Sequence, residues 1–158
     1  MNSFWKNKNV LITGVTGFIG GNLAKNILNF DGNIFGIIRN ENPNSYLFHE
    51  GINKKIRLIN GDLSDQNFLL NTITEQQIDI IFHLAAQVEV GVGLINPFLT
   101  FETNVRGTYN LMEACRIAKK SGQNIESIVV ASSDKAYGEY PIDKMPYRET
   151  YPLLPKYP

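Results

Sequence analysis

Short apolar runs alternate with amphipathic stretches along most of the chain. Continuous runs of Val, Ile and Leu are typical of strands that are covered on both faces. The runs that predict strands are 10–12, 34–38, 56–59, 78–84 and 128–131. Apolar residues at helical spacing follow the first run, and a helix that starts at Ser64 or Asp65 is expected to reach Glu75. Because strands and helices alternate, the pattern predicts an α/β fold with a doubly wound parallel sheet.

A long helix is predicted to start at Pro97 and to reach about residue 120. Its apolar residues recur at helical spacing and are expected to lie on or near one stripe. These residues are Phe101, Val105, Met112, Cys115 and Ala118.

The chain changes character after Gly138. Five of the seven prolines fall within the last eighteen residues, and a segment so rich in proline forms neither a core strand nor a helix over its whole length. We therefore predict a compact domain at 1–138 and a Pro-rich loop at 139–158. Loops of this length within compact proteins tend to be functional.

Composition and charge exclude several classes of protein. The chain has 158 residues, 43% of them hydrophobic, which is enough for one domain with a core. Lys and Arg number 15, as do Asp and Glu, so we expect no nucleic-acid or membrane partner. The single cysteine, Cys115, cannot form an intrachain disulfide and is expected to be a buried helix residue rather than a reactive thiol. The sequence has no candidate membrane span and no signal peptide, so we expect a soluble, cytoplasmic protein.

A glycine-rich turn lies between the first predicted strand and the helix that follows it. Gly14, Gly17 and Gly20 are spaced by three residues in VLITGVTGFIGGNLAKNIL. Glycines allow the backbone to approach a pyrophosphate closely, and the helix N-terminus offers free N–H groups and the positive end of its dipole. A purely structural turn is the alternative, but the position between strand and helix favours a dinucleotide site.

Polar residues at the ends of the next strands bear on the choice of cofactor. Arg39 follows the second strand, where arginine suits the 2′-phosphate of NADP and an acid suits the ribose of NAD. Arg39 therefore favours NADP, although it could instead be a solvated arginine at the end of a strand. The nearby Glu41 leaves NAD open as the cofactor. Asp62 either accepts a hydrogen bond from adenine or caps the next helix. His83 is expected to be a packed, hydrogen-bonded residue, and no metal site is predicted.

Several motifs together resemble a known family. TGVTGFIG, GDL, HLAAQ, TNVRGTYNLMEAC and SSDKAYG occur in this order over almost the whole chain. The sequence resembles the extended short-chain dehydrogenase/reductases that act on nucleotide sugars, and most closely the CDP-glucose type of nucleotide-sugar 4,6-dehydratase. The resemblance implies a Rossmann-type NAD(P)-binding domain at 1–138, an active-site loop at 139–158, a nucleotide-sugar substrate and a homodimer in the full-length protein.

The resemblance also implies roles for particular residues. Ser133 would bind the 4-hydroxyl of the sugar, Asp134 would be the acid of an elimination, and Lys135 would be its base or a partner in removing the C5 proton. Gln87 and Asn104 would lie on the substrate side. The residues that the resemblance places at the cofactor are Gly14, Thr16, Gly17, Phe18, Ile19, Gly20, Arg39, Asp62, Leu63, Leu84, Ala85, Ala86 and Thr103.

The family also carries a catalytic tyrosine in a Tyr-x-x-x-Lys motif. We expect this motif to lie beyond residue 158, together with the sixth strand and the sugar-binding region. The chain would then be the N-terminal portion of a larger enzyme, and 1–158 alone is expected to be inactive. The alternatives to a dehydratase are a 4-epimerase or reductase of the same family and a non-catalytic NAD(P)-binding module.

Overall fold

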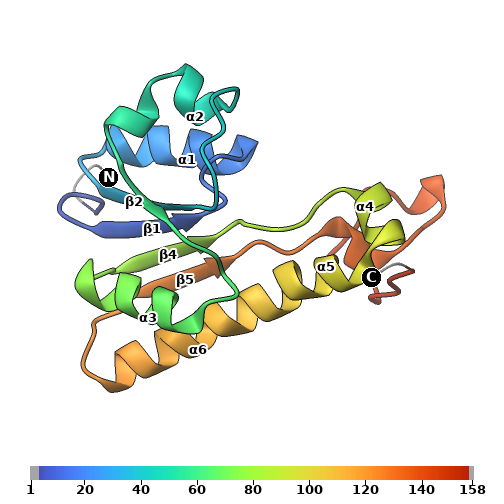
Figure 1. The fold of residues 1–158 in the computed structure, drawn as a ribbon. Helices are drawn as coiled ribbons and strands as arrows, with labels where there is room; N and C mark the ends of the chain where they lie inside the picture. Colours follow the sequence, from blue (N-terminus) through green and yellow to red (C-terminus); the bar gives the residue numbers. More distant parts are fainter. Residues whose placement is uncertain (1–3, 157–158) are drawn as a thin grey trace.

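A computed structural model, which describes residues 4–156, has one five-stranded parallel sheet. The strand order is β3-β2-β1-β4-β5 (Figure 1). The strands are β1 (Asn9–Thr13), β2 (Asn33–Ile38), β3 (Arg57–Asn60), β4 (Ile80–His83) and β5 (Ser127–Val130). The order reverses between β1 and β4, so the sheet is doubly wound and the predicted α/β class is confirmed.

Helices cover both faces of the sheet (Figure 1). On one face, α1 (Phe18–Leu28) and α2 (Tyr46–His49) bury Ala24, Ile27 and Leu47 against β1 and β2. On the other face lie α3 (Gln66–Glu75) and α6 (Gly107–Lys120). Their apolar side chains share a second buried cluster with residues of β1, β2 and β4. The two clusters explain why the strand runs contain so few polar residues.

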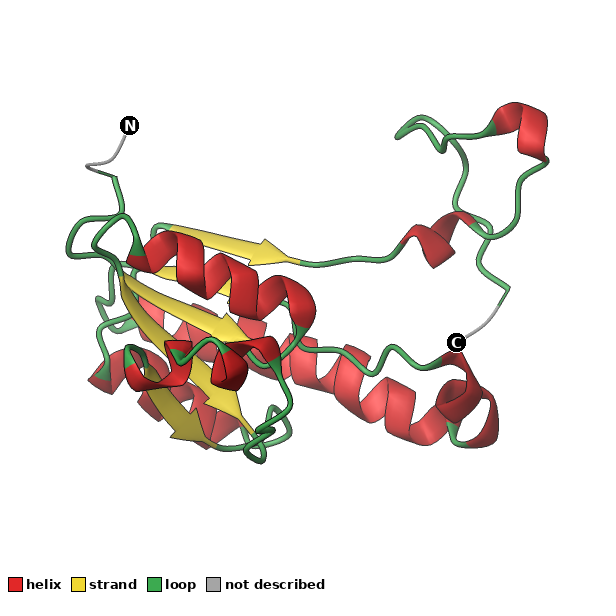
Figure 2. Ribbon diagram, turned by 90° about the horizontal axis from the view of Figure 1, so that it is seen from above, coloured by secondary structure: helices red, strands yellow, loops and turns green. Residues whose placement is uncertain are grey.

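The remaining elements are short and lie in the connections. They are the 3₁₀ helices η1 (Ile52–Lys54), η3 (Asp134–Tyr137) and η4 (Ile142–Lys144), and the helices α4 (Val90–Ile95) and α5 (Pro97–Phe101). Two segments, 84–101 and 131–156, extend beyond the carboxyl ends of the strands (Figures 1 and 2). They carry most of the residues expected at the substrate, whereas the glycine-rich turn lies at the sheet itself.

The predicted long helix is interrupted by a π-helical turn, η2 (Glu102–Arg106), between α5 and α6. The expected stripe is therefore only partly correct. Cys115 and Ala118 are buried, but Phe101 and Val105 are 52% and 51% exposed. A π turn adds a residue to the helix and so rotates its following face by about 100°, and the first half of the helix also extends past the sheet (Figure 1).

Strand β5 differs from the prediction of strands covered on both faces. Its apolar residues Ile128, Val129 and Val130 are 36–45% exposed. Within residues 4–156, β5 pairs only with β4, so it forms an edge of the sheet. Strand side chains point to the two faces of the sheet, so their exposure shows that no described element covers β5 fully on either face.

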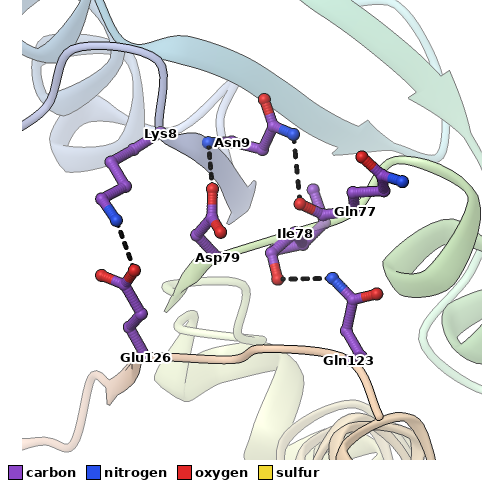
Figure 3. Close-up of polar contacts among 7 residues, drawn as sticks. All are labelled: Lys8, Asn9, Gln77, Ile78, Asp79, Gln123 and Glu126. Carbon is purple, nitrogen blue, oxygen red and sulfur yellow. Dashed lines mark hydrogen bonds and ion pairs between the residues drawn. The ribbon is translucent and has the colours of Figure 1, made fainter. Parts of the chain in front are cut away.

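Polar contacts tie the amino ends of the strands together (Figure 3). The Asn9 backbone N–H donates to Asp79 Oδ2 at 2.8 Å, and its side-chain nitrogen donates to the Gln77 carbonyl at 3.1 Å. An ion pair joins Lys8 to Glu126 across β1, β4 and β5. At the amino ends, these side chains make structural contacts. Ligands of open α/β sheets bind at the carboxyl ends of the strands, so the candidate site is expected there.

Candidate functional site at the carboxyl ends of the strands

The glycine-rich turn brings backbone atoms closer together than side chains would allow. Gly14 has φ +71°, and a Cβ atom there would lie 2.7 Å from the Ala85 backbone nitrogen. A Cβ atom on Gly20 would overlap the Gly14 carbonyl oxygen. Gly17 is the N-cap of α1 and provides no capping side chain, so the N–H groups of the first helical turn are available to an anion.

Two exposed apolar residues begin this helix. Phe18 and Ile19 are 82% and 65% exposed, although both were predicted to bind the cofactor. Thr16, in the turn itself, is half-buried. Exposure of large apolar side chains beside a glycine-rich turn is compatible with a ligand that lies over them.

His83 connects β1, β4 and α6 through hydrogen bonds. Its Nδ1 lies 2.7 Å from Thr13 Oγ1, and its Nε2 lies 2.9 Å from Thr108 Oγ1. Thr108 donates its own proton to the Asn104 carbonyl at 2.6 Å, so its oxygen accepts from His83 Nε2. Thr13 Oγ1 then donates to Nδ1 and accepts from the Ala85 N–H at 3.2 Å. The prediction of a packed, hydrogen-bonded histidine is confirmed.

Burial keeps this histidine uncharged. His83 is 3% exposed, and desolvation lowers the pKa of its imidazole. With both ring nitrogens bonded, His83 positions the Leu84–Ala85 backbone beside the glycine turn rather than acting on a ligand. Leu84 and Ala85 are half-buried there and Ala86 is exposed.

The Asn104 side chain forms two hydrogen bonds with the backbone of Gln87. Its Oδ1 accepts from the Gln87 N–H at 2.7 Å, and its Nδ2 donates to the Gln87 carbonyl at 3.0 Å. Asn104 belongs to the π turn, and its neighbour Thr103 is half-buried. The Gln87 side chain turns back onto its own loop, where its amide contacts the backbone of Glu89. The two residues expected on the substrate side are thus brought together.

Arg39 and Asp62 follow two neighbouring strands. The Gly61 N–H donates to the Ile38 carbonyl at 2.9 Å, which aligns the two strand ends. Asp62 Oδ1 accepts from the Ser64 N–H at 2.8 Å. This hydrogen bond, assisted by the charge of Arg39, lowers the pKa of the Asp62 carboxyl, so Asp62 is ionised at neutral pH.

The helix after β3 is capped by a different residue. Asp65 Oδ1 accepts from the Phe68 N–H at 2.9 Å, so Asp65 is the N-cap of α3 and the capping alternative for Asp62 is wrong. Leu63 is buried beneath this loop, and Asn110 Nδ2 donates to its carbonyl at 2.9 Å. No role for Asn110 was predicted from the sequence. The available signal was a polar residue on the buried face of a predicted helix.

Ser133, Asp134 and Lys135 lie in the turn that follows β5. Ser133 caps the 3₁₀ helix η3, because its Oγ accepts from the Lys135 N–H at 3.2 Å. Lys135 Nζ lies 3.7 Å from Asp134 Oδ2, and their side chains are 74% and 61% exposed. Both charged groups are accessible on a turn that the strand end anchors: the Ala131 N–H donates to the His83 carbonyl at 3.0 Å.

One tyrosine–lysine pair within the chain has the spacing of Tyr-x-x-x-Lys. Tyr140 and Lys144 are four residues apart, so the expectation that this spacing occurs only beyond residue 158 is wrong. The pair is not on one helical face, because Tyr140 precedes Pro141 in a loop and Lys144 ends η4. The Tyr140 hydroxyl donates to the Pro152 carbonyl at 2.9 Å. Spacing alone therefore does not make this pair a catalytic base.

Other features of the described residues limit the chemistry further. Within residues 4–156, no cluster of three or more His, Cys, Asp or Glu side chains could hold a metal ion. In the same part of the chain, no helix is both long and apolar enough to span a bilayer. Cys115 is buried, and burial raises the pKa of its thiol to about 11, which agrees with the prediction of an unreactive cysteine.

Comparison with known proteins identifies relatives over the whole sheet. Residues 11–158 match the family described as GDP-mannose 4,6 dehydratase. CDP-glucose 4,6-dehydratase of Salmonella typhimurium is 35% identical over 136 residues, which are 85% of this chain and 37% of that protein. CDP-paratose 2-epimerase of Salmonella typhi is 34% identical over 143 residues, 89% of this chain and 40% of that one.

Solved structures agree with the sequence comparison. The UDP-glucose 4-epimerase of Thermus thermophilus in complex with NAD is 30% identical, with a TM-score of 0.79. The alignment covers 94% of this chain and 45% of that one. The chain thus spans less than half the length of each of these relatives.

Proposed function

Because the chain belongs to the epimerase/dehydratase family of extended short-chain dehydrogenase/reductases, we propose that it is the cofactor-binding half of a nucleotide-sugar 4,6-dehydratase. The observation that carries this proposal is the Ser133–Asp134–Lys135 turn. It places a hydroxyl, a carboxyl and an amine on consecutive residues directly after the strand next to β4. An elimination needs both an acid and a base beside one sugar.

The cofactor in this proposal is NAD or NADP. The Gly14–Gly20 turn supports it, because its glycines let the backbone fold closely on itself and leave the first N–H groups of α1 without a capping side chain, as an anion site requires. The Thermus thermophilus relative was solved with NAD. Arg39 favours NADP, since a guanidinium suits a 2′-phosphate. When bound, the nicotinamide supplies the oxidant that takes a hydride from C4 of the sugar and returns it to C6.

The side chains of this chain would then carry the proton transfers. Ser133 would hold the 4-hydroxyl, whose proton would pass to the tyrosine expected beyond residue 158 when C4 is oxidised, and the resulting ketone would make the C5 proton acidic. Lys135 removes that proton or assists its removal, and Asp134 donates a proton to the C6 hydroxyl, which departs as water. The hydride returned to C6 and a proton returned to C5 complete a 4-keto-6-deoxy sugar, so the reaction has no net redox change.

Two other functions are compatible with the family. A nucleotide-sugar epimerase is supported by the relatives that carry this name, and it would need no acid at residue 134. A non-catalytic NAD(P)-binding module would need neither Asp134 nor Lys135. Both alternatives predict that these two residues can be replaced without loss of function.

Replacement of Asp134 by Asn distinguishes a dehydratase from these alternatives. The full-length protein is incubated with CDP-, GDP-, UDP- and dTDP-hexoses, and the 4-keto-6-deoxy product is measured by NMR. We expect Asp134→Asn to lower kcat by about 10²–10⁴-fold, the contribution of one general acid, while cofactor binding measured by calorimetry is unchanged. Asp143→Asn, on the exposed η4 turn, is the matched control. A wild-type protein that forms an epimer and no 4-keto-6-deoxy sugar would refute the proposal.

A further inference from the structure

Four tyrosines hold the segment that follows the Asp134–Tyr137 turn. The rings of Tyr137 and Tyr147 are stacked, with centroids 5.1 Å apart and planes 13° from parallel. Those of Tyr140 and Tyr151 are also stacked, at 5.1 Å and 26°. The edge of one pair meets the other, since Tyr140 and Tyr147 lie 5.9 Å apart at 75°. We call these four residues the tyrosine cluster.

Burial indicates that the cluster is what orders this segment. Between residues 139 and 156, only Tyr140, Tyr147 and Tyr151 are half-buried, and all the other residues are exposed. The segment has no apolar core of its own, and stacked or edge-to-face aromatic pairs are favourable beyond the surface they bury. Its path beside the turn therefore depends on these rings.

Hydrogen bonds connect the cluster to the end of the catalytic turn. The Tyr147 hydroxyl donates to the Gly138 carbonyl at 3.0 Å. Gly138 ends η3 with φ +74°, and a Cβ atom there would overlap the Leu154 carbonyl oxygen. Gly138 is thus held by Tyr147 on one side and by the backbone of Leu154 on the other, in a conformation that glycine alone adopts easily.

The turn itself has few other contacts. The side chains of Asp134 and Lys135 contact each other, and the Asp134 carboxyl also accepts a hydrogen bond from Ser133 Oγ at 3.5 Å; both side chains are largely exposed. One end of the turn is attached to β5, and its other end is Gly138. The direction in which the two charged side chains point is therefore set at these two ends.

We propose that Tyr147 is a positioning residue for Asp134 and Lys135, acting through its stack on Tyr137 and its hydrogen bond to Gly138. The inference rests on the proposed dehydratase function. It predicts that Tyr147 affects elimination but not the binding of the cofactor, because none of its contacts lies at the glycine turn. Small displacements of catalytic groups are costly, since an error of about 1 Å can lower a rate by about 10²-fold.

The test compares three variants of the full-length protein. Tyr147→Leu removes both the stack and the hydroxyl, whereas Tyr147→Phe removes only the hydroxyl. Tyr151→Phe is the control, because Tyr151 stacks on Tyr140 but its hydroxyl makes no hydrogen bond within residues 4–156. We expect kcat for 4-keto-6-deoxy product to fall by roughly 10–10²-fold in Tyr147→Leu, less in Tyr147→Phe and not in Tyr151→Phe. The dissociation constant of the cofactor, measured by calorimetry, should stay within about threefold in all three.

Hydrogen exchange supplies a readout that does not depend on activity. The Lys135 and Gly138 amides donate to Ser133 Oγ and to the Lys135 carbonyl, so a loosened turn exchanges them faster. We expect faster exchange over 133–138 in Tyr147→Leu, with the sheet unchanged. Unchanged exchange, or faster exchange with a normal kcat, would overturn the inference alone. Absence of product from the wild-type enzyme would instead overturn the proposed function, and with it the catalytic role of Tyr147.

Discussion

At the scale of single residues, His83 shows how a buried polar group prepares the site without acting in it. Its two nitrogens join Thr13 on β1 to Thr108 on α6. Thr13 in turn accepts from the Ala85 N–H, and Ala85 lies against the glycine turn. The position of the β4 loop relative to a bound dinucleotide therefore depends on an uncharged imidazole at residue 83.

The neutral state of His83 makes folding stability depend on pH. Its pKa is lowered in the folded chain by burial, while in the unfolded chain it returns to about 6.5. Below that pH the unfolded state binds the proton first. The contribution of His83 to the free energy of unfolding is therefore fully present above about pH 6.5 and falls as the pH drops towards the folded pKa. The slope reaches at most about 1.4 kcal/mol per pH unit.

Urea denaturation between pH 5 and pH 8 measures this dependence. We expect His83→Gln to flatten the slope below about pH 6.5. His49→Gln is the control, since the side chain of the second histidine is 83% exposed, and it should retain the wild-type slope. Equal slopes in wild type and His83→Gln would contradict the assignment of a neutral, buried imidazole.

At the scale of elements, the sequence predicted the buried segments well and the irregular ones poorly. Every strand run was predicted within two residues of its observed ends, because each strand is a short, mostly apolar run bounded by polar residues. The π turn at Glu102–Arg106 carries no comparable signal, since five residues with a single apolar side chain are too few to show a change of period. The short helices α2 and α4 were also missed, because four and six residues are too few to show a period.

In the candidate site, too, some features could be predicted from the sequence and others could not. Glycine spacing predicted a tight turn between β1 and α1, and the structure shows that side chains at Gly14 and Gly20 would overlap backbone atoms of this chain. The links that depend on tertiary contacts could not be predicted, such as Asn104 with the Gln87 backbone or Tyr147 with Gly138. The Tyr140–Lys144 spacing, which was not recognised in the sequence, does not identify a catalytic pair, because the intervening Pro141 prevents the helix on which the motif depends.

The two hydrogen bonds of Asn104 attach the loop after β4 to the π turn η2, and this attachment can be tested. Asn104→Ala leaves the Gln87 N–H and carbonyl without their partners, which should cost about 1–3 kcal/mol of unfolding free energy. Amide exchange over 84–89 should rise as the loop detaches from the π turn. Asn104→Asp keeps the acceptor and loses the donor, so its effect should lie between Ala and wild type. Unchanged exchange over 84–89 in Asn104→Ala would show that the π turn does not hold this loop.

At the scale of the whole molecule, some large apolar side chains lie outside the two buried clusters and are exposed. On the long helix, Phe101, Val105 and Tyr109 are spaced by four residues and are 52%, 51% and 54% exposed. None of the three belongs to the buried cluster that contains Leu111 and Ala114. Monomeric proteins rarely expose large contiguous apolar patches, and a helix pairing with its own copy is a simple symmetric way to cover one.

We therefore expect this helix face to be the dimer interface of the protein, with Val105 near its centre. Val105→Lys places a charge where interface cores exclude charge, so the dissociation constant measured by sedimentation should rise at least roughly tenfold. Thermal stability of the monomer should change little, because Val105 contributes to neither buried cluster. Ile142→Lys makes the same chemical change at a residue that is 91% exposed in the tail and should leave association unaltered. If wild type sediments as a monomer at all concentrations, or if Val105→Lys associates as tightly as wild type, the long helix does not mediate self-association.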